Sequence, residues 1–271
     1  MVPDFDALGA ITCAGLQMTR HPDAGAESMS IVTSNRGAET TGFSRASSRY
    51  ESSSVIRPSK YDRTQKLLEW IGEGKRVLEV GCSTGYISRL LVERGCEVIG
   101  VEVDPAAAEK ARAHCREVFI LDLNSPQWVE SFGGRMLDVV LLADVLEHLV
   151  DPWRVLREIA GLLDKGGAVV ISLPNVVHFL TRAKIALGQF NYTPTGILDH
   201  THLRFFTIKT ARELIESSGY RITRFHPAIG GGRVSDRIRS GLQFAARFAP
   251  GMFAYQMLFE CRARVDKDVR K

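Results

Sequence analysis

Residues 77–85 read Val-Leu-Glu-Val-Gly-Cys-Ser-Thr-Gly, an apolar run that passes straight into a turn of small residues. The run predicts a buried strand over Arg76–Val80, and the residues beyond the turn predict a helix over Gly85–Arg94. Small residues let the backbone approach a ligand, and the start of a helix offers N–H groups without helical partners. No G-K-[S/T] follows and the spacing is not G-x-G-x-x-G, so the turn is not a P-loop and lacks the dinucleotide-binding fingerprint.

The segments that follow alternate between strand and helix patterns, which predicts βαβ units and a doubly wound parallel sheet. Two late strands are separated by no clear crossover helix of the usual size, so we expect them to close the sheet as an antiparallel pair. The fold class is therefore α/β, with a Rossmann-like seven-stranded sheet and an antiparallel last strand. The expected strands after the first are Glu97–Val103, Val118–Leu121, Leu137–Ala143, Ala168–Leu173, Tyr220–Phe225 and Met252–Arg262. The expected helices between them are Pro105–Cys115, Pro152–Leu163 and Thr210–Ser218, with a turn at residues 165–167.

Composition excludes several other classes of protein. The 271 residues are 45% hydrophobic and 24% charged, which is ordinary for a globular domain. No apolar run reaches the eighteen or so residues of a membrane-spanning helix. The five cysteines are scattered without a C-x-x-C pair, which argues against a cysteine-only zinc site and favours a reducing, cytoplasmic location.

The ends of the chain differ from its middle. Residues 1–48 are rich in Ser, Thr, Gly and Ala and are expected to form a disordered leader. Residues 49–265 are expected to form the domain, and residues 266–271 a tail.

Positive charge is concentrated late in the chain. The net charge is +4, and from residue 221 onward eleven Lys and Arg face four Asp and Glu. Within this part, residues 235–249 predict a helix with Arg239 and Arg247 on one face and Ile238 and Leu242 on another. Such a helix can lie on an anionic membrane surface and admit lipid-linked acceptors. It can equally pack across the sheet edge with its arginines in water, and this second interpretation is the one we favour.

Carboxylates follow the predicted strands at the same edge as the glycine turn. Glu102 ends the second strand 21 residues after Gly81, where it could accept both hydrogens of a ribose diol. Asp122 follows the third strand, where it could accept the amino group of a base, and Ala143 and Asp144 end the fourth. Open α/β sheets bind ligands at the carboxyl ends of their strands. A glycine turn with helix-capping carboxylates is the structural alternative.

The segment after the fourth strand carries a second group of polar side chains. Asp144, Glu147 and His148 are spaced at i, i+3 and i+4, so a helical turn would place all three on one face. They could bind a divalent cation, or His148 could act as a base oriented by Glu147. Capping and a buried His–Glu hydrogen bond would explain the same residues without chemistry.

A long polar loop at residues 191–207 has the composition of a functional loop. It contains Asp199, His200, His202 and Arg204 within six residues. In an extended segment the two histidines would point the same way, toward the site. Residues 175–187 before it predict a lid helix, so residues 175–207 form an acceptor-side insertion. The alternative is that Asp199 and the histidines only pin the loop.

Residues 58–225 resemble the class I S-adenosylmethionine-dependent methyltransferases, and in particular the ubiquinone-type O-methyltransferases and bacterial small-molecule or glycan methyltransferases. The resemblance implies a cofactor, S-adenosylmethionine, and a role for each matching residue. Gly81, Ser83 and Gly85 would pass along its methionine part, and Glu79 would orient its amino group. Ser83 stands where the commoner motif has Gly. Further cofactor contacts would come from Glu102 at the ribose, from Asp122 and Leu123 around the adenine, and from Ala143.

The acceptor side resembles the same families. Ubiquinone-type enzymes and small-RNA 3′-terminal ribose methyltransferases carry an acid-x-x-Glu-His element after the fourth strand, and in the RNA enzymes a later His completes a Mg²⁺ or Mn²⁺ site. Asp144, Glu147 and His148 match this element, and His200 or His202 could complete it. The metal ligands expected are Asp144, Glu147, His148 and His202, and the catalytic residues His148, His200, His202, Glu147 and Asp199.

The leading functional hypothesis is methylation of a hydroxyl on a small-molecule, glycan or lipid-linked acceptor. An RNA ribose 2′-O-methyltransferase is the alternative, weakened by the absence of an RNA-binding module in the sequence and by its modest charge. A non-catalytic cofactor-binding subunit is the third hypothesis. The sequence leaves the oligomeric state open.

Overall fold

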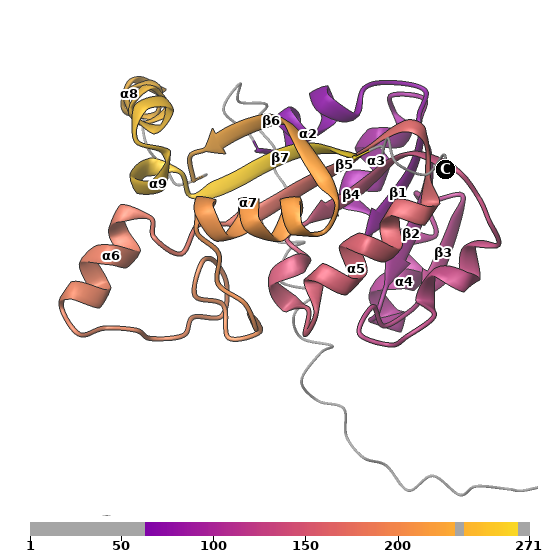
Figure 1. The fold of residues 1–271 in the computed structure, drawn as a ribbon, viewed down its shortest axis with the longest axis horizontal. Coiled ribbons are helices and arrows are strands. Elements are labelled where there is room, and N and C mark those ends of the chain that lie inside the picture. Colours follow the sequence, from indigo (N-terminus) through magenta and orange to yellow (C-terminus); the bar gives the residue numbers. More distant parts are fainter. Residues whose placement is uncertain (1–62, 231–235, 265–271) are drawn as a thin grey trace, which may run out of the picture. The chain divides into compact units, whose positions relative to one another are not determined.

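Seven strands form one sheet in the order β3-β2-β1-β4-β5-β7-β6 (Figure 1). The computed structural model describes residues 63–230 and 236–264. β1 to β5 pair in parallel, and β7 runs antiparallel between β5 and β6. The expected doubly wound sheet with a reversed last strand is therefore confirmed. The strands are β1 (Arg76–Val80), β2 (Glu97–Glu102), β3 (Glu117–Ile120), β4 (Leu137–Ala143), β5 (Leu163–Pro174), β6 (Tyr220–Ala228) and β7 (Gln256–Ala263).

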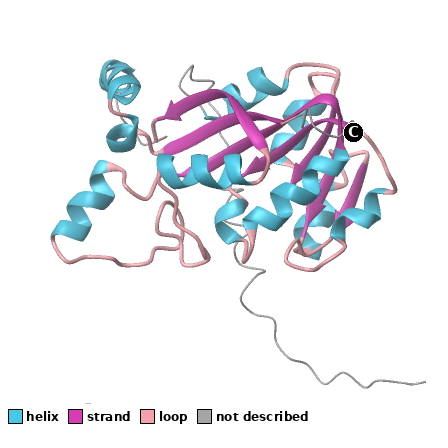
Figure 2. Cartoon of the chain, viewed as in Figure 1, coloured by secondary structure: helices cyan, strands magenta, loops and turns pink. Residues whose placement is uncertain are grey.

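Helices cover both faces of this sheet (Figure 2). None of the helices in the described residues is long and apolar enough to cross a membrane. The α-helices are α2 (Arg63–Ile71), α3 (Tyr86–Val92), α4 (Pro105–Ala111), α5 (Pro152–Ile159), α6 (Phe179–Ala186), α7 (Ile208–Ser217), α8 (Asp236–Phe248) and α9 (Pro250–Phe253). Three short 3-10 helices are η1 (Trp128–Phe132), η2 (Leu146–His148) and η3 (Ala160–Leu162).

The core is divided by the sheet because successive strand residues point to opposite faces. In β1, Leu78 belongs to a cluster that includes Val155 of α5, whereas Val77 belongs to one that includes Leu67 of α2 and Leu91 of α3. The apolar runs of the central strands are therefore buried on both sides, as expected for parallel strands. Because β1 to β4 run parallel, their carboxyl ends, where the candidate functional residues lie, meet at the same end of the sheet.

The strand expected at Met252–Arg262 begins later than the sequence indicated. Residues 250–253 form α9, and β7 starts at Gln256. Pro250 lies in the first turn of α9, where its missing N–H costs nothing, and the Met252 and Phe253 N–H groups donate to the carbonyl of Ala249 at 3.0 and 3.2 Å. The apolar residues Met252 and Phe253 of this short helix precede β7 directly, so in sequence they look like the first residues of the strand.

Other boundaries also shift. The helix expected over Pro105–Cys115 ends at Ala111. The lid helix expected over residues 175–187 shortens to α6, because the side chain of Asn175 donates to the Ala254 carbonyl at 2.8 Å and the chain does not enter a helix there. The turn expected at residues 165–167 is an irregularity within β5, whose pairing with β4 jumps from Leu163 to Ala168. The expected leader at 1–48 and tail at 266–271 lie outside the described residues.

Candidate functional site

The turn after β1 has an unusual backbone. Gly81, Ser83 and Gly85 all have positive φ, at 68°, 49° and 82°. A Cβ on Gly81 would stand 2.8 Å from Cγ2 of Val145, and one on Gly85 would stand 3.0 Å from the Ala111 Cα. Both glycines are therefore required by conformation and by close packing. Ser83 takes a conformation that is rare outside glycine, at the position where the commoner motif has Gly.

The N–H groups of the turn are largely used within the fold. Those of Gly81 and Cys82 both donate to the carbonyl of Val101, at 2.8 and 3.0 Å, and that of Ser83 donates to Oε2 of Glu102 at 2.8 Å. The turn is thus tied to β2 and offers fewer unpaired N–H groups than the sequence led us to expect. By contrast, the hydroxyl of Ser83 is buried and has no hydrogen-bond partner within the described residues. A buried hydroxyl in this state is suited to a polar ligand group.

Glu102 holds the end of β2 against this turn. Its Oε1 accepts the N–H groups of Val103 and Asp104 at 2.9 and 3.0 Å, while its Oε2 accepts that of Ser83. A carboxylate has about four acceptor sites, and three of them are occupied here. In this conformation one site is left for a ribose hydroxyl, where the sequence suggested two.

Glu79 lies beneath the turn, where only 3% of it is exposed. It accepts a hydrogen bond from the hydroxyl of Ser88, which in turn accepts the thiol of Cys115 at 3.2 Å. Burial raises the pKa of Glu79 to about 8, with the Ser88 bond acting in the opposite direction. The carboxyl is therefore mostly protonated at neutral pH.

The remaining cofactor candidates lie at the same sheet edge, at the ends of β3 and β4. Asp122 is exposed, and its Oδ1 accepts the backbone and side-chain N–H groups of Asn124 at 2.9 and 3.1 Å. Leu123 is buried, and Ala143 is half-buried at the last position of β4. As the topology predicted, these residues lie at the carboxyl end of the sheet, as do the glycine turn and Glu102.

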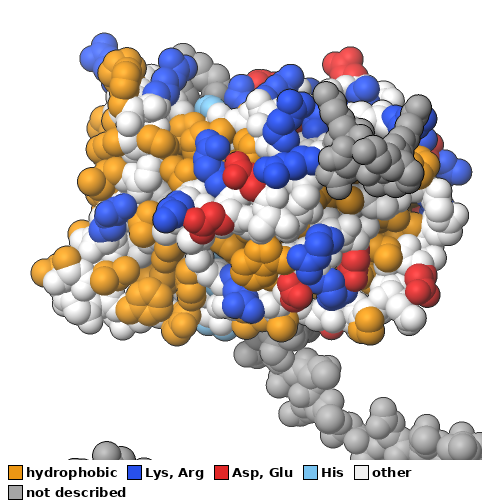
Figure 3. Space-filling model, in the orientation of Figure 1, with side chains coloured by type: hydrophobic (Ala, Val, Ile, Leu, Met, Phe, Trp, Pro, Cys, Tyr) orange, Lys and Arg blue, Asp and Glu red, His pale blue; other side chains and the backbone are white. Residues whose placement is uncertain are grey.

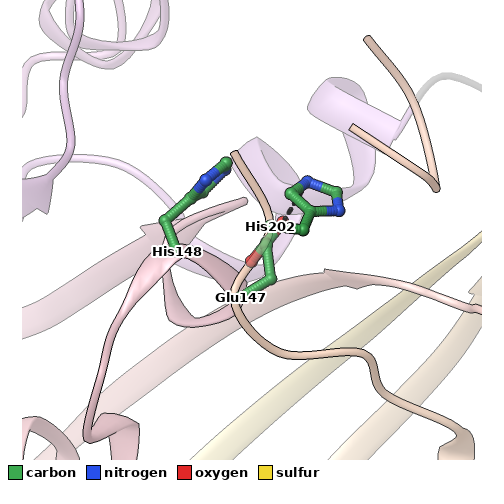
Figure 4. Close-up of side chains that lie close together, drawn as sticks. All are labelled: Glu147, His148 and His202. Atoms are coloured by element: carbon green, nitrogen blue, oxygen red, sulfur yellow. Dashed lines mark ion pairs between the residues drawn. The ribbon is translucent and has the colours of Figure 1, made fainter. Parts of the chain in front are cut away.

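A second cluster forms just beyond β4. Glu147 and His148 belong to η2, and His202 comes from the loop more than fifty residues later (Figure 4). One ligand atom from each of the three lies within 4.8 Å of the others. His202 Nε2 is 4.0 Å from Glu147 Oε1. The ring centroids of His148 and His202 are 4.8 Å apart, with the rings edge to face. Three of the four expected metal ligands are thus brought together.

Asp144, the fourth expected ligand, points elsewhere. Its backbone is left-handed, with φ 58°, and the turn that follows is a three-residue 3-10 turn instead of an α-helix. The shared face expected from the i, i+3, i+4 spacing therefore does not form. Asp144 makes an ion pair with Arg63 and accepts the hydroxyl of Ser172 at 3.2 Å.

Glu147 is fully buried, and neither of its carboxyl oxygens has a hydrogen-bond partner among residues 63–230 and 236–264. Burial, followed by the negative charge of Asp144, raises the pKa of Glu147 well above its usual range. A buried carboxyl without partners is stable only when it is protonated or when a cation offsets its charge. Two imidazoles stand beside it.

Both imidazoles are held through the same ring nitrogen. Nδ1 of His202 lies 3.0 Å from the carbonyl of Ile197, and Nδ1 of His148 lies 3.2 Å from the carbonyl of Thr201. Since a carbonyl only accepts hydrogen bonds, each Nδ1 donates, and in the neutral form of either ring Nε2 then keeps its lone pair. Burial, followed by repulsion from His148, lowers the pKa of His202, so this ring is neutral at pH 7.

The loop that carries His202 is folded against η2. The N–H groups of Leu203 and Arg204 both donate to the carbonyl of Glu147, at 2.8 and 2.9 Å. Asp199 Oδ1 accepts the backbone N–H and the hydroxyl of Thr201, at 2.9 and 2.8 Å. Asp199 therefore braces the residue that orients His148 and does not itself belong to the cluster.

His200 lies apart from the cluster. Residues 199–202 form a turn, in which the His202 N–H donates to the Asp199 carbonyl at 3.1 Å, so the extended segment expected from the sequence is wrong. His200 is exposed, with Nδ1 3.4 Å from the carbonyl of Thr193. The two histidines consequently do not point the same way.

Three residues near the site carried no signal in the sequence. Arg63 reaches Asp144 across 81 positions of the chain. Tyr255 is half-buried just before β7, and a Cβ on Gly196 would stand 2.8 Å from its hydroxyl. His178 is buried, its Nδ1 has no hydrogen-bond partner among the described residues, and its ring centroid lies 5.6 Å from that of Tyr255. Arg63 of α2 and Tyr255 before β7 come near Asp144 at the end of β4 only through the tertiary fold.

Comparisons with known proteins agree with this geometry. A family model described as a methyltransferase domain matches residues 53–224. The ubiquinone biosynthesis O-methyltransferase of Aeromonas salmonicida is 34% identical over 163 residues, which is 56% of this chain and 68% of that protein. The Coxiella burnetii protein of the same name is 27% identical over 164 residues, 57% of this chain and 69% of that protein.

A solved structure shares the fold. It is a SAM-dependent methyltransferase from Thermotoga maritima, titled a possible histamine N-methyltransferase, with a TM-score of 0.55, 18% identity and coverage of 81% of this chain and 97% of its own. The fold and the glycine turn define a class I S-adenosylmethionine-dependent methyltransferase. This chain belongs to the methyltransferase-domain family.

Proposed function

We propose that the protein transfers the methyl group of S-adenosylmethionine to a hydroxyl oxygen of a small-molecule, glycan or lipid-linked acceptor, with chemistry at Glu147, His148 and His202. The observation that carries the proposal is the buried carboxyl of Glu147, which has no hydrogen-bond partner among the described residues and lies beside two imidazoles whose Nδ1 atoms donate to backbone carbonyls. A hydroxyl must lose its proton during methylation, and this cluster supplies the groups that could assist. Two relatives named as O-methyltransferases support oxygen as the acceptor atom.

The donor set of the cluster fits a divalent cation. Glu147, His148 and His202 would hold it, and the ion would offset the charge of a buried carboxylate whose oxygens accept no hydrogen bond within the described residues. When bound, such an ion lowers the pKa of an acceptor hydroxyl and fixes its oxygen. Mixed imidazole and carboxylate donors suit a first-row transition ion such as Mn²⁺ better than Mg²⁺, which prefers oxygen ligands.

The chain's own residues would divide the remaining work. Gly81, Ser83 and Glu102 would position the cofactor at the ends of β1 and β2. His202 is neutral at pH 7, so its Nε2 can serve as a ligand to the cation or, when no cation is bound, accept a proton. Because the sulfonium of the cofactor is already activated, the main task left to the protein is to align the two reactants.

The test compares His148→Ala and His202→Ala with His200→Ala, a control that removes an exposed imidazole outside the cluster. We expect the first two variants to bind S-adenosylhomocysteine as the wild type does, but to lose Mn²⁺ binding measured by electron paramagnetic resonance. They should also lose turnover more than 100-fold on a panel of catechols, sugars and polyprenyl phenols.

Different results would favour other functions. Wild-type protein that binds S-adenosylhomocysteine but neither Mn²⁺ nor any hydroxyl acceptor would indicate a non-catalytic cofactor-binding subunit. Turnover on a short RNA with a free 3′ ribose, and none on the panel, would instead indicate the ribose methyltransferase. Equal loss in His200→Ala would remove the special role of the cluster.

A further inference from the structure

Helix α8 presents its apolar side chains to the outside. Gln243 and Ala246 face the domain, where the Gln243 amide donates to the carbonyl of Pro227 at 2.8 Å. Phe244 and Phe248 are 62% and 76% exposed, and their rings lie 5.0 Å apart. The interpretation favoured from sequence, a helix packed through its apolar face, is thus incomplete, because the largest apolar side chains remain in water.

Helix α6 and the residues after it show the same feature. Every residue from 182 to 192 is exposed, and Leu187 is 75% exposed. Isolated apolar residues on a surface are ordinary, but a contiguous group indicates an interaction site. We call the exposed apolar residues of these helices and of the segments beside them the apolar end. Its members are Leu180, Ile185, Leu187, Phe190, Tyr192, Ile238, Phe244, Phe248 and Met252.

The two parts of the apolar end are joined. Phe179 at the start of α6 contacts Phe253 of α9, with ring centroids 6.0 Å apart, and Asn175 donates to the carbonyls of Gly251 and Ala254. Figure 1 shows α6, α8 and α9 at the same end of the sheet, beyond β7. In the space-filling view, hydrophobic side chains gather along this end, with Lys and Arg between them (Figure 3).

The charge of the apolar end is mainly positive. Residues 175–198 and 236–259 contain five Lys and Arg and a single acid, Asp236 at the start of α8. Arg182, Lys184, Arg237 and Arg247 are all exposed. Exposed aromatic and aliphatic side chains among an excess of cations complement an anionic lipid surface. A second copy of this chain would instead bring like charges together.

A row of aromatic rings connects the apolar end with the cluster beyond β4. Phe190 lies 5.8 Å from Phe205, and Phe205 lies 6.2 Å from the ring of His202. Tyr192 flanks the row, 6.5 Å from Phe205. An acceptor with an apolar tail could therefore leave a bilayer along these rings and bring its hydroxyl to His202.

We propose that the apolar end docks on the surface of an anionic lipid bilayer, with Phe244 and Phe248 inserted among the lipids and the cations at the headgroups. The choice of a lipid-linked acceptor rests on the function proposed above, whereas the docking itself does not.

The test is flotation of the full-length protein with vesicles of phosphatidylcholine containing about 30% phosphatidylglycerol, and with vesicles of phosphatidylcholine alone. We expect binding to the anionic vesicles and a loss of more than tenfold in the double variant Phe244→Ser/Phe248→Ser. The matched control is Val92→Ser/Val150→Ser, which removes two exposed apolar side chains that lie outside the apolar end. For charge, Arg247→Glu should weaken binding at least fivefold, as expected for the loss of one cation near the surface, and Lys165→Glu in β5 should not.

Several outcomes would overturn the proposal. They are no binding of the wild type to anionic vesicles, undiminished binding by the Phe variant, or equal loss in its control. A wild-type dimer that the Phe variant dissociates, without vesicle binding, would assign the surface to a second copy. The variants must still bind S-adenosylhomocysteine, which shows that they are folded. Vesicle binding without turnover on any hydroxyl acceptor would leave the docking intact and contradict only the proposed function.

Discussion

A buried carboxyl group without a hydrogen-bond partner is a source of instability at any pH at which it ionises, and Glu147 is such a group. Its pKa is raised in the folded protein, so the folded state binds this proton more tightly than the unfolded state does. The stability that it contributes is therefore fully present below the unfolded pKa of about 4.3 and is lost as pH rises through the folded value.

We expect Glu147→Gln, which keeps the shape of the neutral acid, to raise the thermal midpoint of the metal-free protein by several degrees at pH 8 and by little at pH 4. A gain of about 1–2 kcal/mol corresponds to roughly 2–8 °C in a domain of this size. Thermal melts monitored by circular dichroism at the two pH values measure the effect. A variant less stable than wild type at pH 8 would show that the Glu147 carboxylate is already compensated in the metal-free protein. The same substitution should abolish Mn²⁺ binding, so stability and function would change in opposite directions.

Glu79 offers a pH-dependent test of cofactor binding. With its pKa at about 8, this carboxyl must release its proton to pair with the amino group of the cofactor. Ligand affinity should therefore rise with pH, by up to tenfold per unit, between pH 6 and 8, and level off above. Calorimetric titration with S-adenosylhomocysteine should show this slope in the wild type and a flatter one in Glu79→Gln. Equal slopes would mean that Glu79 does not meet the amino group.

The residues that sequence analysis located correctly are those whose environment is local. Glu102 ends its strand, and Glu147 and His148 follow theirs, so the order of elements was enough to place them. Arg63 of α2 and Tyr255 before β7 reach the end of β4 only through the tertiary fold, and no short-range pattern marks them. The burial of Glu147 without a partner is likewise a property of packing.

At the scale of elements, the loop at residues 193–204 acts as a brace. Asp199 fixes Thr201, Thr201 accepts the His148 ring, and the loop backbone donates to the Glu147 carbonyl. Asp199→Ala removes two hydrogen bonds to Thr201, so we expect Mn²⁺ affinity to fall about tenfold while S-adenosylhomocysteine affinity is unchanged. Asp199→Asn keeps an oxygen that can accept both bonds and should restore most of the loss. If neither variant alters Mn²⁺ binding, the loop does not position His148.

The glycine turn is an element whose tight packing can be measured. Gly85→Ala meets both a positive φ and the Ala111 backbone at 3.0 Å, whereas Gly95→Ala meets a φ of 73° with nothing within 4 Å. The second variant should cost about 1 kcal/mol from backbone strain, and the first at least 1 kcal/mol more, with weaker cofactor binding. Urea unfolding of both variants compares them. Equal costs would mean that α4 moves to relieve the contact.

Elements with strong periodicity were predictable, and the boundaries that failed have physical causes. The central strands β1 and β4 are buried on both faces and were located at their observed bounds. β2 and β3 were located to within one residue, whereas β5 begins five residues before the expected Ala168. The helical turn at 144–148 became a 3-10 turn because Asp144 adopts a left-handed backbone, which moved one expected ligand away from the cluster. The outward-facing aromatics of α8 could not be inferred either, since amphipathic spacing does not say which face meets the domain.

At the scale of the whole molecule, the proposed cofactor and acceptor sites draw on different parts of one sheet. The proposed cofactor residues lie at the ends of β1, β2, β3 and β4, whereas α6 and its loop follow β5. The chain after α6 returns to the sheet as β6 and β7, and β7 is inserted between β5 and β6. A break within α6 should therefore leave the two fragments assembled.

Limited trypsin digestion tests this separation. Among the described residues, Arg182 and Lys184 lie within the long exposed run, so cleavage there should be fast. Mass spectrometry identifies the cleavage site, and gel filtration shows whether the fragments remain together. We expect the nicked protein to bind S-adenosylhomocysteine within twofold of the intact protein, because β1 to β4 and the glycine turn are unaffected. Its turnover should fall more than tenfold, since the aromatic row from Phe190 to His202 is no longer anchored at α6.

An Arg182→Gln/Lys184→Gln variant that resists cleavage and keeps its turnover under trypsin is the control. Loss of cofactor binding on nicking would show that the two halves of the sheet do not function independently.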